Sequence, residues 1–306
     1  MSCPYGLRPS SLSVAIITGN EERHIGDALA SIAGLASQVV VVLDSRTHDR
    51  TAAICRDYGA TVHVEAWRGY PAQRNRALDL CEGDWVLFLD ADERVTDELR
   101  DEIRAVLAQD NESPDTRAQT RELRHESPDT RAQTQTCHSL SPVSSLQSPV
   151  SSLQSPVSYV GYWIPRYNRF FGRTVRGGGW YPDHQLRLVR RGRARYDETR
   201  LVHELVQLDG PAGYLSGHIL HLNIERLDEL WRKQTSYALY EAQMLYLAGR
   251  RAQWRNFVGA PLREFRRRYL TLGGYRDGAL GLLLCGTLAY FEWVKYIHLK
   301  GLELAR

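Results

Sequence analysis

Two aspartates separated by one residue, Asp90 and Asp92, directly follow an apolar run at 85–89. A short, uninterrupted apolar run of this kind predicts a fully buried strand of a parallel sheet. Open α/β sheets bind their ligands at the carboxyl ends of the strands, and Mg²⁺ is held by one or two carboxylates together with substrate phosphates. The pair therefore indicates metal-assisted chemistry on a phosphorylated substrate, with exposed loop acids as the alternative.

Polar residues also follow the earlier apolar runs. The run 12–17 ends at Thr18, and the run 39–43 ends at Asp44. Because the carboxyl ends of parallel strands meet at one edge of a sheet, these side chains predict a pocket for a nucleotide. The sequence contains neither Gly-x-Gly-x-x-Gly after its first strand nor Gly-x-x-x-x-Gly-Lys-Ser/Thr, which argues against a dinucleotide cofactor and against a P-loop.

Strand and helix patterns alternate through the first third of the chain. Strands are expected at 12–17, 39–43, 61–65 and 85–89, and helices at 22–32, 49–58, 71–80 and 96–107. Asp49 is well placed to cap the second helix, and Thr96 opens the fourth. This alternation predicts a parallel sheet with right-handed crossovers.

The segment 109–158 has a different character. Residues 112–120 recur as 126–134, and Ser-Pro-Val-Ser-Ser-Leu-Gln occurs at 141 and again at 148. Repeats this short do not match a solenoid, and the segment offers few large apolar side chains to offset the entropy of ordering. We predict a disordered insertion, with a Pro-dependent recognition arm as the alternative.

After the insertion, strands are expected at 162–165 and 185–189, and helices at 227–246, 254–270 and 277–302. Seven arginines fall between 250 and 268 against one acid, Glu264, with aromatic residues between them. A basic helix with aromatic anchors predicts a membrane-surface element attracted to anionic lipid. A nucleic-acid patch is the competing interpretation, but no recognition motif accompanies the arginines.

Length, net charge and cysteine content further narrow the class of protein to which the chain can belong. The chain has 306 residues and a formal net charge of +3, too small to indicate a nucleic-acid binder. Its five cysteines form no Cys-x-x-Cys pair, which suits a reducing cytosol. The first ten residues lack the apolar core of a signal peptide. The uncharged run 278–291 is shorter than the roughly 20 residues that span a bilayer, so we expect a cytoplasmic protein, peripheral on the inner membrane.

The motifs at the strand ends resemble those of family 2 glycosyltransferases, and most closely the branch of bacterial lipopolysaccharide core glucosyltransferases. They lie at 18–22, 44–51, 67–75, 89–93, 178–188 and 202–204. The second motif departs modestly, because it reads Asp-Ser-Arg-Thr-His-Asp where the family usually has Asp-Ser-Gly-Ser-Thr-Asp. The resemblance covers 11–106 and 159–224. It implies an α/β GT-A nucleotide-sugar-binding fold, Rossmann-like and mostly parallel, with a helical C-terminal extension.

Together with the composition of the insertion and of the C-terminal third, the resemblance leads us to expect four parts. These are a nucleotide-sugar-binding half (11–108), the insertion (109–158), an acceptor-side half of the catalytic domain (159–224) and a helical, basic, membrane-associating extension (225–306).

The resemblance implies an inverting, metal-dependent glycosyltransferase. The sugar, glucose from UDP-glucose, would move onto a glycolipid or lipopolysaccharide-core acceptor. Mg²⁺ or Mn²⁺ would be held by Asp92, assisted by Asp90, with His203 as a further ligand. The general base would be Asp183, with Glu204 as the second candidate. The expected nucleotide-sugar-binding residues are Thr18, Asn20, Glu21, Asp44, Asp49, Gln73, Arg74, Asn75 and Asp90.

Several alternatives stay open at this point. Asp183 could instead cap the turn at Gln185, His203 could be structural, and Arg187 could bind phosphate or face water. A non-catalytic glycan- or lipid-binding scaffold and a transferase for a different lipid-linked or peptide acceptor are the competing functions. Asp-nucleophile phosphatases usually carry Asp-x-Asp on their first strand, whereas here it follows the fourth expected strand.

Overall fold

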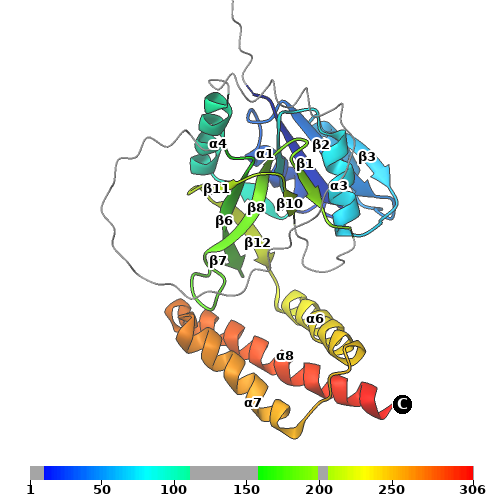
Figure 1. Ribbon diagram of the computed structural model, residues 1–306, viewed down its shortest axis with the longest axis vertical. Helices are drawn as coiled ribbons and strands as arrows, with labels where there is room; N and C mark the ends of the chain where they lie inside the picture. Colours follow the sequence, from blue (N-terminus) through cyan, green and yellow to red (C-terminus); the bar gives the residue numbers. More distant parts are fainter. Residues whose placement is uncertain (1–9, 111–157, 199–205, 306) are drawn as a thin grey trace, which may run out of the picture.

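The structure is a computed structural model that describes residues 10–110, 158–198 and 206–305. Figure 1 shows an α/β unit from which a helical unit extends. Almost all of the expected disordered insertion, together with His203 and Glu204, lies outside the described residues.

The α/β unit is built on a ten-stranded sheet whose main path runs β3-β2-β1-β4-β8-β6-β12-β5. Its first four strands are β1 (Leu12–Thr18), β2 (Gln38–Asp44), β3 (Thr61–Glu65) and β4 (Trp85–Phe88). They pair in parallel, as the alternation predicted. The sheet then changes direction, because β8 (Asp183–Arg190) is antiparallel to both β4 and β6 (Gly161–Phe170). The expected α/β class is confirmed, with this antiparallel strand at the centre.

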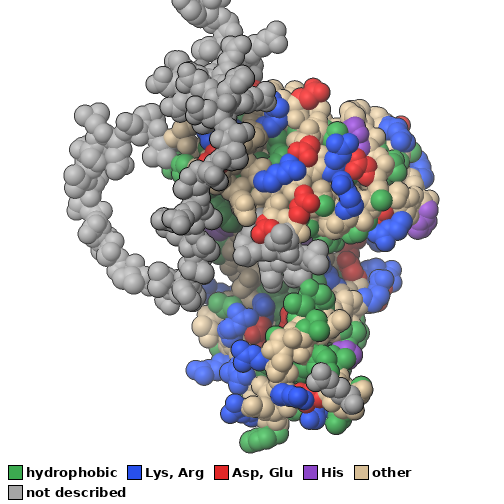
Figure 2. All heavy atoms as spheres, turned by 45° about the vertical axis from the view of Figure 1, so that its right-hand side comes forward, with side chains coloured by type: hydrophobic (Ala, Val, Ile, Leu, Met, Phe, Trp, Pro, Cys, Tyr) green, Lys and Arg blue, Asp and Glu red, His purple; other side chains and the backbone are tan. Residues whose placement is uncertain are grey.

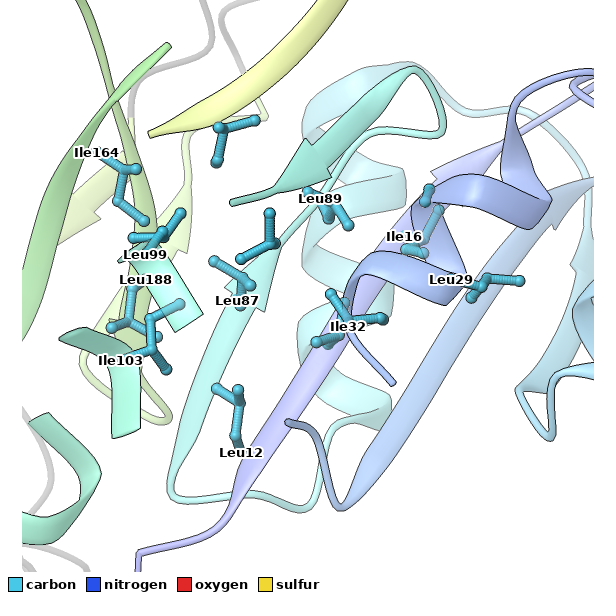
Figure 3. Packing of buried hydrophobic residues seen from close by; sticks show 14 of the residues in the cluster. Leu12, Ile16, Leu29, Ile32, Leu87, Leu89, Leu99, Ile103, Ile164 and Leu188 are labelled. Atoms are coloured by element: carbon cyan, nitrogen blue, oxygen red, sulfur yellow. The ribbon is translucent and has the colours of Figure 1, made fainter. Parts of the chain in front are cut away.

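Helices cover both faces of the sheet. They are α1 (Ile25–Ser31), α2 (Thr51–Asp57), α3 (Tyr70–Leu80) and α4 (Asp97–Gln109). On one face Leu29 and Ile32, from α1 and its C-cap, and Ile103 of α4 pack against strand residues such as Leu87 and Ile164 (Figure 3). On the other face Ala77 and Leu78 of α3 join Val40, Val42 and Phe88. Burial of each large apolar side chain stabilises the fold by about 1.5–3 kcal/mol, so the strand ends rest on a rigid support.

The helix starts differ slightly from the expectation. Helix α1 begins at Ile25 rather than near 22. Helix α2 begins at Thr51 with Arg50 in the N-cap position, so the expected cap by Asp49 is wrong in register. The Asp49 carboxylate nevertheless accepts the Thr51 backbone N–H at 2.9 Å. Thr96 caps α4 as expected, since its hydroxyl accepts the Leu99 N–H at 3.4 Å.

Two short strands pair with each other next to Asp92. Strand β5 (Glu93–Val95) follows Asp92 and pairs antiparallel with β12 (Ile219–Ile224), in a register that sets His221 opposite Glu93. Strand β12 also runs parallel to β6. The remaining strands are β7 (Arg173–Thr174), β9 (Ala194–Tyr196), β10 (Val206–Leu208) and β11 (Ala212–Tyr214).

The helical unit comprises α6 (Leu227–Leu247), α7 (Trp254–Phe265), a π-helical turn (Arg266–Thr271), a 3₁₀ turn (Gly274–Asp277) and α8 (Gly278–Leu304). Helix α8 lies against both α6 and α7 (Figure 1). The Asp277 carboxylate accepts the backbone N–H groups of Arg176 and Gly177 at 3.0 and 2.7 Å. A side chain at Gly177 would stand 2.2 Å from the Gly273 carbonyl oxygen, so only glycine permits this close contact.

One helical segment among the described residues, Gly274–Leu304, is long and apolar enough to cross a membrane by length and composition alone. The uncharged run 278–291 is only part of this helix, so its length alone does not exclude a span. The Lys295 ammonium lies 3.0 Å from Glu241 of α6, so that charge is paired inside the helical unit. The central helix of a soluble bundle has the same composition.

Candidate active site

A cavity of about 270 Å³ lies at the carboxyl ends of β1 and β4. Five of the expected site residues line it: Thr18, Glu21, Arg74, Asp90 and Asp92. His221 of β12, which the sequence argument did not select, lines it as well. The strand order therefore brings together residues from both halves of the α/β unit.

Beside the cavity, arginines and acids alternate along a continuous network. We call it the arginine cluster, and its members in order are Arg74, Asp90, Arg187, Glu93, Arg166 and Asp183. Arg187 bridges Asp90 at 2.5 Å and Glu93 at 2.7 Å. Arg74 donates to the second Asp90 oxygen at 3.0 Å. Arg187 therefore does not face water; it is buried and ties β8 to the end of β4.

Pairing within the arginine cluster fixes the charge of its acids. Burial alone raises the pKa of Asp90, but Arg187 and Arg74 outweigh it and hold that pKa well below its ordinary value. Burial likewise opposes ionisation of Asp183, and Arg166 with Asn168 lowers its pKa. Both acids are therefore anionic at neutral pH and already matched by arginines.

Asp92 has a different environment. Its carboxylate lies 3.3 Å from His221 Nε2, and its side chain is 33% exposed. The Asn168 amide nitrogen donates to the Trp180 carbonyl and to Asp183, both at 3.0 Å. The Asn168 oxygen therefore faces His221 Nδ1 at 2.6 Å and accepts its proton. That leaves Nε2 facing Asp92, so a proton or a cation is needed between them.

The pair Asp92 and His221 fits a divalent cation that completes its shell from the substrate. Among the residues the structure describes, no group of three or more His, Cys, Asp or Glu side chains is arranged to hold a metal ion. Mg²⁺ commonly takes one or two carboxylates plus phosphate oxygens and water, and carboxylate and water likewise suit Mn²⁺. The orienting hydrogen bond from His221 to Asn168 is the kind that metal-bound histidines make.

Glu21 also lines the cavity, together with Asp92. Burial raises the pKa of Glu21 to about 7, and the neighbouring charges of Asp92, Asp49 and Glu229 add to that effect. Asp92 itself has a lowered pKa, because its hydrogen bond with His221 outweighs the effect of burial. The site thus concentrates negative charge around Asp92, which favours a cation there.

Other expected binding residues have structural partners. The Asn20 side chain accepts the His48 N–H at 3.0 Å, and Asp49 accepts the Glu22 N–H at 3.1 Å. Both hydrogen bonds join the loop after β1 to the loop after β2. Asn75 exchanges hydrogen bonds with the backbone of Tyr196. These residues hold the loops and strands around the cavity in place.

Three side chains of the first three expected motifs, of which Thr18 lines the cavity, have buried polar atoms without a hydrogen-bond partner within the described part of the chain. They are the Thr18 and Thr47 hydroxyls and both amide atoms of Gln73. Asp44 lies beside Gly19, which lines the cavity, and accepts from Arg46 at 2.6 Å. That hydrogen bond lowers the pKa of Asp44. Buried polar atoms without a partner, such as those of Thr18, Thr47 and Gln73, are the kind of group that a polar ligand satisfies.

Asp183, the first candidate base, lies in the arginine cluster. One of its oxygens accepts from Arg166 at 2.9 and 2.6 Å and from Asn168 at 3.0 Å, and the other accepts from Gln185 at 2.8 Å. Glu204 and His203 fall outside the described residues. The roles expected for all three stay predictions.

His221 and Asn168 were missed because they lie on strands with no long apolar run. A signal was present: Leu220-His221-Leu222-Asn223-Ile224 alternates between apolar and polar residues, as a half-buried strand does. The alternation predicts that His221 and Asn223 share one face.

Comparisons with known proteins agree with the motifs. Residues 13–113 match the family model described as Glycosyl transferase family 2. The lipopolysaccharide core biosynthesis glycosyltransferase LpsC of Rhizobium meliloti is 27% identical over 289 residues, which cover 92% of this chain and 89% of that protein. An uncharacterized glycosyltransferase of Rickettsia bellii is 41% identical over 106 residues, and this match spans 35% of this chain and 36% of that protein.

Among solved structures, glucosyl-3-phosphoglycerate synthase from Mycobacterium tuberculosis, in complex with Mn²⁺, UDP and glucosyl-3-phosphoglycerate, is similar to part of the chain. It is 25% identical and covers 28% of this chain and 34% of that chain, with a TM-score of 0.26. A TM-score this low gives the structural likeness no weight.

Proposed function

Because the chain is a family 2 glycosyltransferase near the lipopolysaccharide core branch, we propose that it transfers glucose from UDP-glucose onto a lipopolysaccharide-core or other lipid-linked acceptor. The observation that carries the proposal is the cavity at the ends of β1 and β4, where Asp92 and His221 face each other and the Thr18 hydroxyl has no hydrogen-bond partner among the described residues. The relative that matches most of the chain is named for lipopolysaccharide core biosynthesis, which supports this class of acceptor.

The nucleoside is proposed to bind along the ends of β1 and β2. Thr18 and Gln73 offer buried hydroxyl and amide groups that lack partners among the described residues. Trp67 and Tyr70 line the cavity with their rings edge to face at 4.8 Å. Flat apolar surfaces of this kind bind a sugar or base, and a few convergent polar groups set its orientation.

Asp92 and His221 are proposed to hold Mg²⁺ or Mn²⁺. A bound divalent cation supplies positive charge opposite the leaving diphosphate. Asp90 is proposed to act indirectly, because both of its oxygens are already paired with arginines. Its role is to hold Arg74 at the cavity wall, where the guanidinium also faces the donor.

The proposed reaction is a single displacement with inversion. The acceptor hydroxyl attacks the anomeric carbon from the face opposite the diphosphate, a carboxylate takes its proton, and the nucleoside diphosphate leaves. Asp183 keeps a place in this proposal, but its four donors lower its pKa and weaken it as a base. Glu204 therefore becomes the stronger of the two candidates.

A thermal-shift panel tests the donor site. We expect the unfolding midpoint to rise with UDP-glucose and Mn²⁺ and not with other nucleotide sugars, since only a ligand of the folded state raises it. The rise should vanish in Asp92→Ala. Asp101→Ala is the matched control, because Asp101 is an exposed acid on α4 paired with Arg104. Absence of any shift in the wild-type protein would remove the support for this donor.

The helical unit is proposed to dock on an anionic membrane at the cytoplasmic face of the inner membrane. On α7, Trp254, Val258 and Leu262 follow one another at helical spacing and are 84%, 68% and 65% exposed. Arg255 and Arg263 lie beside them and are exposed. Figure 2 shows green apolar and blue basic side chains together on the helical unit, in the lower part of the view. An exposed apolar stripe flanked by arginines matches a surface with apolar chains under anionic headgroups.

Vesicle sedimentation tests this docking. Full-length protein should bind vesicles that contain phosphatidylglycerol and should release them at high salt. Trp254→Ser should weaken binding on the order of tenfold. Tyr214→Ser, which alters an exposed aromatic residue of the α/β unit, should leave binding unchanged. Equal losses in both variants would contradict docking through α7.

A further inference from the structure

A second cavity, of about 520 Å³, lies between the loop after β1 and the start of α6. It shares Glu21 with the donor cavity, so the two are neighbours. Four cationic side chains line it: Arg23, Arg226, Arg232 and Lys233. Figure 1 shows α6 following directly from β12, the strand that carries His221.

Three of the four cations have acidic partners. Arg23 pairs with Glu225 at 3.1 Å. Arg226 and Arg232 pair with Asp228 at 2.8 and 3.2 Å. No ion pair within the described ranges involves Lys233. Its ammonium instead donates to the neutral side-chain oxygen of Asn223 at 3.1 Å.

None of the acids that line the cavity forms an ion pair with Lys233 among the described residues. Glu225 is paired with Arg23, and Glu229 accepts the backbone N–H of Glu225 at 3.0 Å. Glu21 lies on the donor side, where its pKa is raised to about 7 mainly by burial. Among the described residues, the positive charge of Lys233 thus has no matching carboxylate contact.

Lys233 is also aimed at the donor side. Its partner Asn223 donates to Asn168 at 3.3 Å, the same amide oxygen that orients His221. Lys233 is thus connected, through Asn223 and Asn168, to His221 beside Asp92.

We propose that Lys233 binds a phosphate group of a substrate in this second cavity, so that helix α6 completes the active site. An ammonium with free donors and no carboxylate partner is suited to phosphate oxygens, which it meets as a point charge. The phosphate belongs either to the diphosphate of the donor or to a phosphorylated acceptor. Assignment to the donor rests on the proposed function, whereas binding of phosphate by Lys233 does not.

Calorimetric titration of the full-length chain tests the proposal in two arms. The first arm compares UDP with uridine in the presence of Mn²⁺. The second titrates inorganic phosphate into protein saturated with UDP. The variants are Lys233→Gln, Lys233→Arg, which keeps the charge, and Lys300→Gln. The last is the matched control, because it removes an exposed lysine of α8 that pairs with Glu303.

If the phosphate belongs to the donor, Lys233→Gln weakens UDP about tenfold and leaves uridine unchanged. If it belongs to the acceptor, UDP is unchanged and phosphate binding in the second arm is lost. In both cases Lys233→Arg retains most of the binding and Lys300→Gln retains all of it. A folded Lys233→Gln that matches the wild type in both arms overturns the proposal. Failure of wild-type protein to bind UDP refutes the donor assignment, and phosphate titrated without UDP still decides the role of Lys233.

Discussion

Two regions that begin at the same strand end have opposite electrostatic characters. The arginine cluster around Asp90 alternates cations and acids, and each acid has at least one arginine within 3.0 Å. Two residues further along the chain, Asp92 contacts only His221 among the ion pairs of the described residues. Glu21, whose pKa is raised to about 7, adds part of a negative charge there at neutral pH. One carboxylate of the Asp-x-Asp motif is saturated by protein, and the other is short of a cation.

In the Asp-x-Asp motif the two aspartates look equivalent, but their surroundings in the structure give them different roles. A buried network with every charge matched holds strands together and changes little on binding. Asp92 is partly exposed and has His221 as its one ion-pair partner among the described residues, so a ligand cation can still join it. Breaking the first region should therefore cost stability, and breaking the second should cost binding.

The largest expected effect is on the arginine cluster. Arg187→Ala leaves Asp90 and the fully buried Glu93 without their shared cation. Breaking a buried pair from one side costs about 3–5 kcal/mol of unfolding free energy, which urea denaturation measures. The control is Arg104→Ala, an exposed pair on α4, expected to cost less than about 1 kcal/mol. Similar losses in both would contradict the structural role of the cluster.

The two aspartates of the motif give the sharpest contrast. Asp90→Asn should cost about 2–3 kcal/mol of unfolding free energy, because Arg74 and Arg187 lose a charged partner. Asp92→Asn should change stability by less than about 1 kcal/mol. Only the second variant should lose the Mn²⁺-dependent rise in the midpoint with UDP-glucose. The reverse pattern would show that Asp90 is the metal ligand.

The smallest expected effect concerns pH. Glu21 has a pKa of about 7 in the folded state and an ordinary value of 4.5. The folded state therefore holds this proton more tightly, and its stability falls as pH rises from about 4.5 to 7. Glu21→Gln should remove that fall, which amounts to about 1 kcal/mol after solvent screening. Denaturation in EDTA at pH 5 and pH 8 measures it, and parallel pH profiles for variant and wild type would contradict it.

The first half of the fold could be predicted because its strands carry strong local signals. The run 39–43 is apolar and contains four β-branched valines. Thr96 marks the start of α4 correctly, whereas the starts expected for α1 and α2 differ by a few residues. Strand β5 could not be predicted in this way. It is three residues long and contains Glu93 and Arg94, so its conformation depends on pairing with β12.

The site was predictable in its residue types and less so in their roles. Asp90 and Asp92 look alike in sequence. They differ in the structure because Arg187 of β8 pairs with Asp90 and not with Asp92. Asn75 and Asp49 belong to the expected motif but hold backbone groups. His221 lies far along the chain and reaches Asp92 through strand pairing, which no local pattern reports.

The antiparallel position of β8 has a consequence for synthesis. The chain up to the end of α4 contains β1 to β4 but neither β8 nor β12, so one edge of β4 (Trp85–Phe88) has no partner at that stage. An apolar edge strand is a template for pairing with other chains. Translation at 5–20 residues per second leaves it exposed for roughly ten seconds before β8 emerges. A fragment ending at residue 110 should therefore aggregate, although it holds both aspartates of the motif.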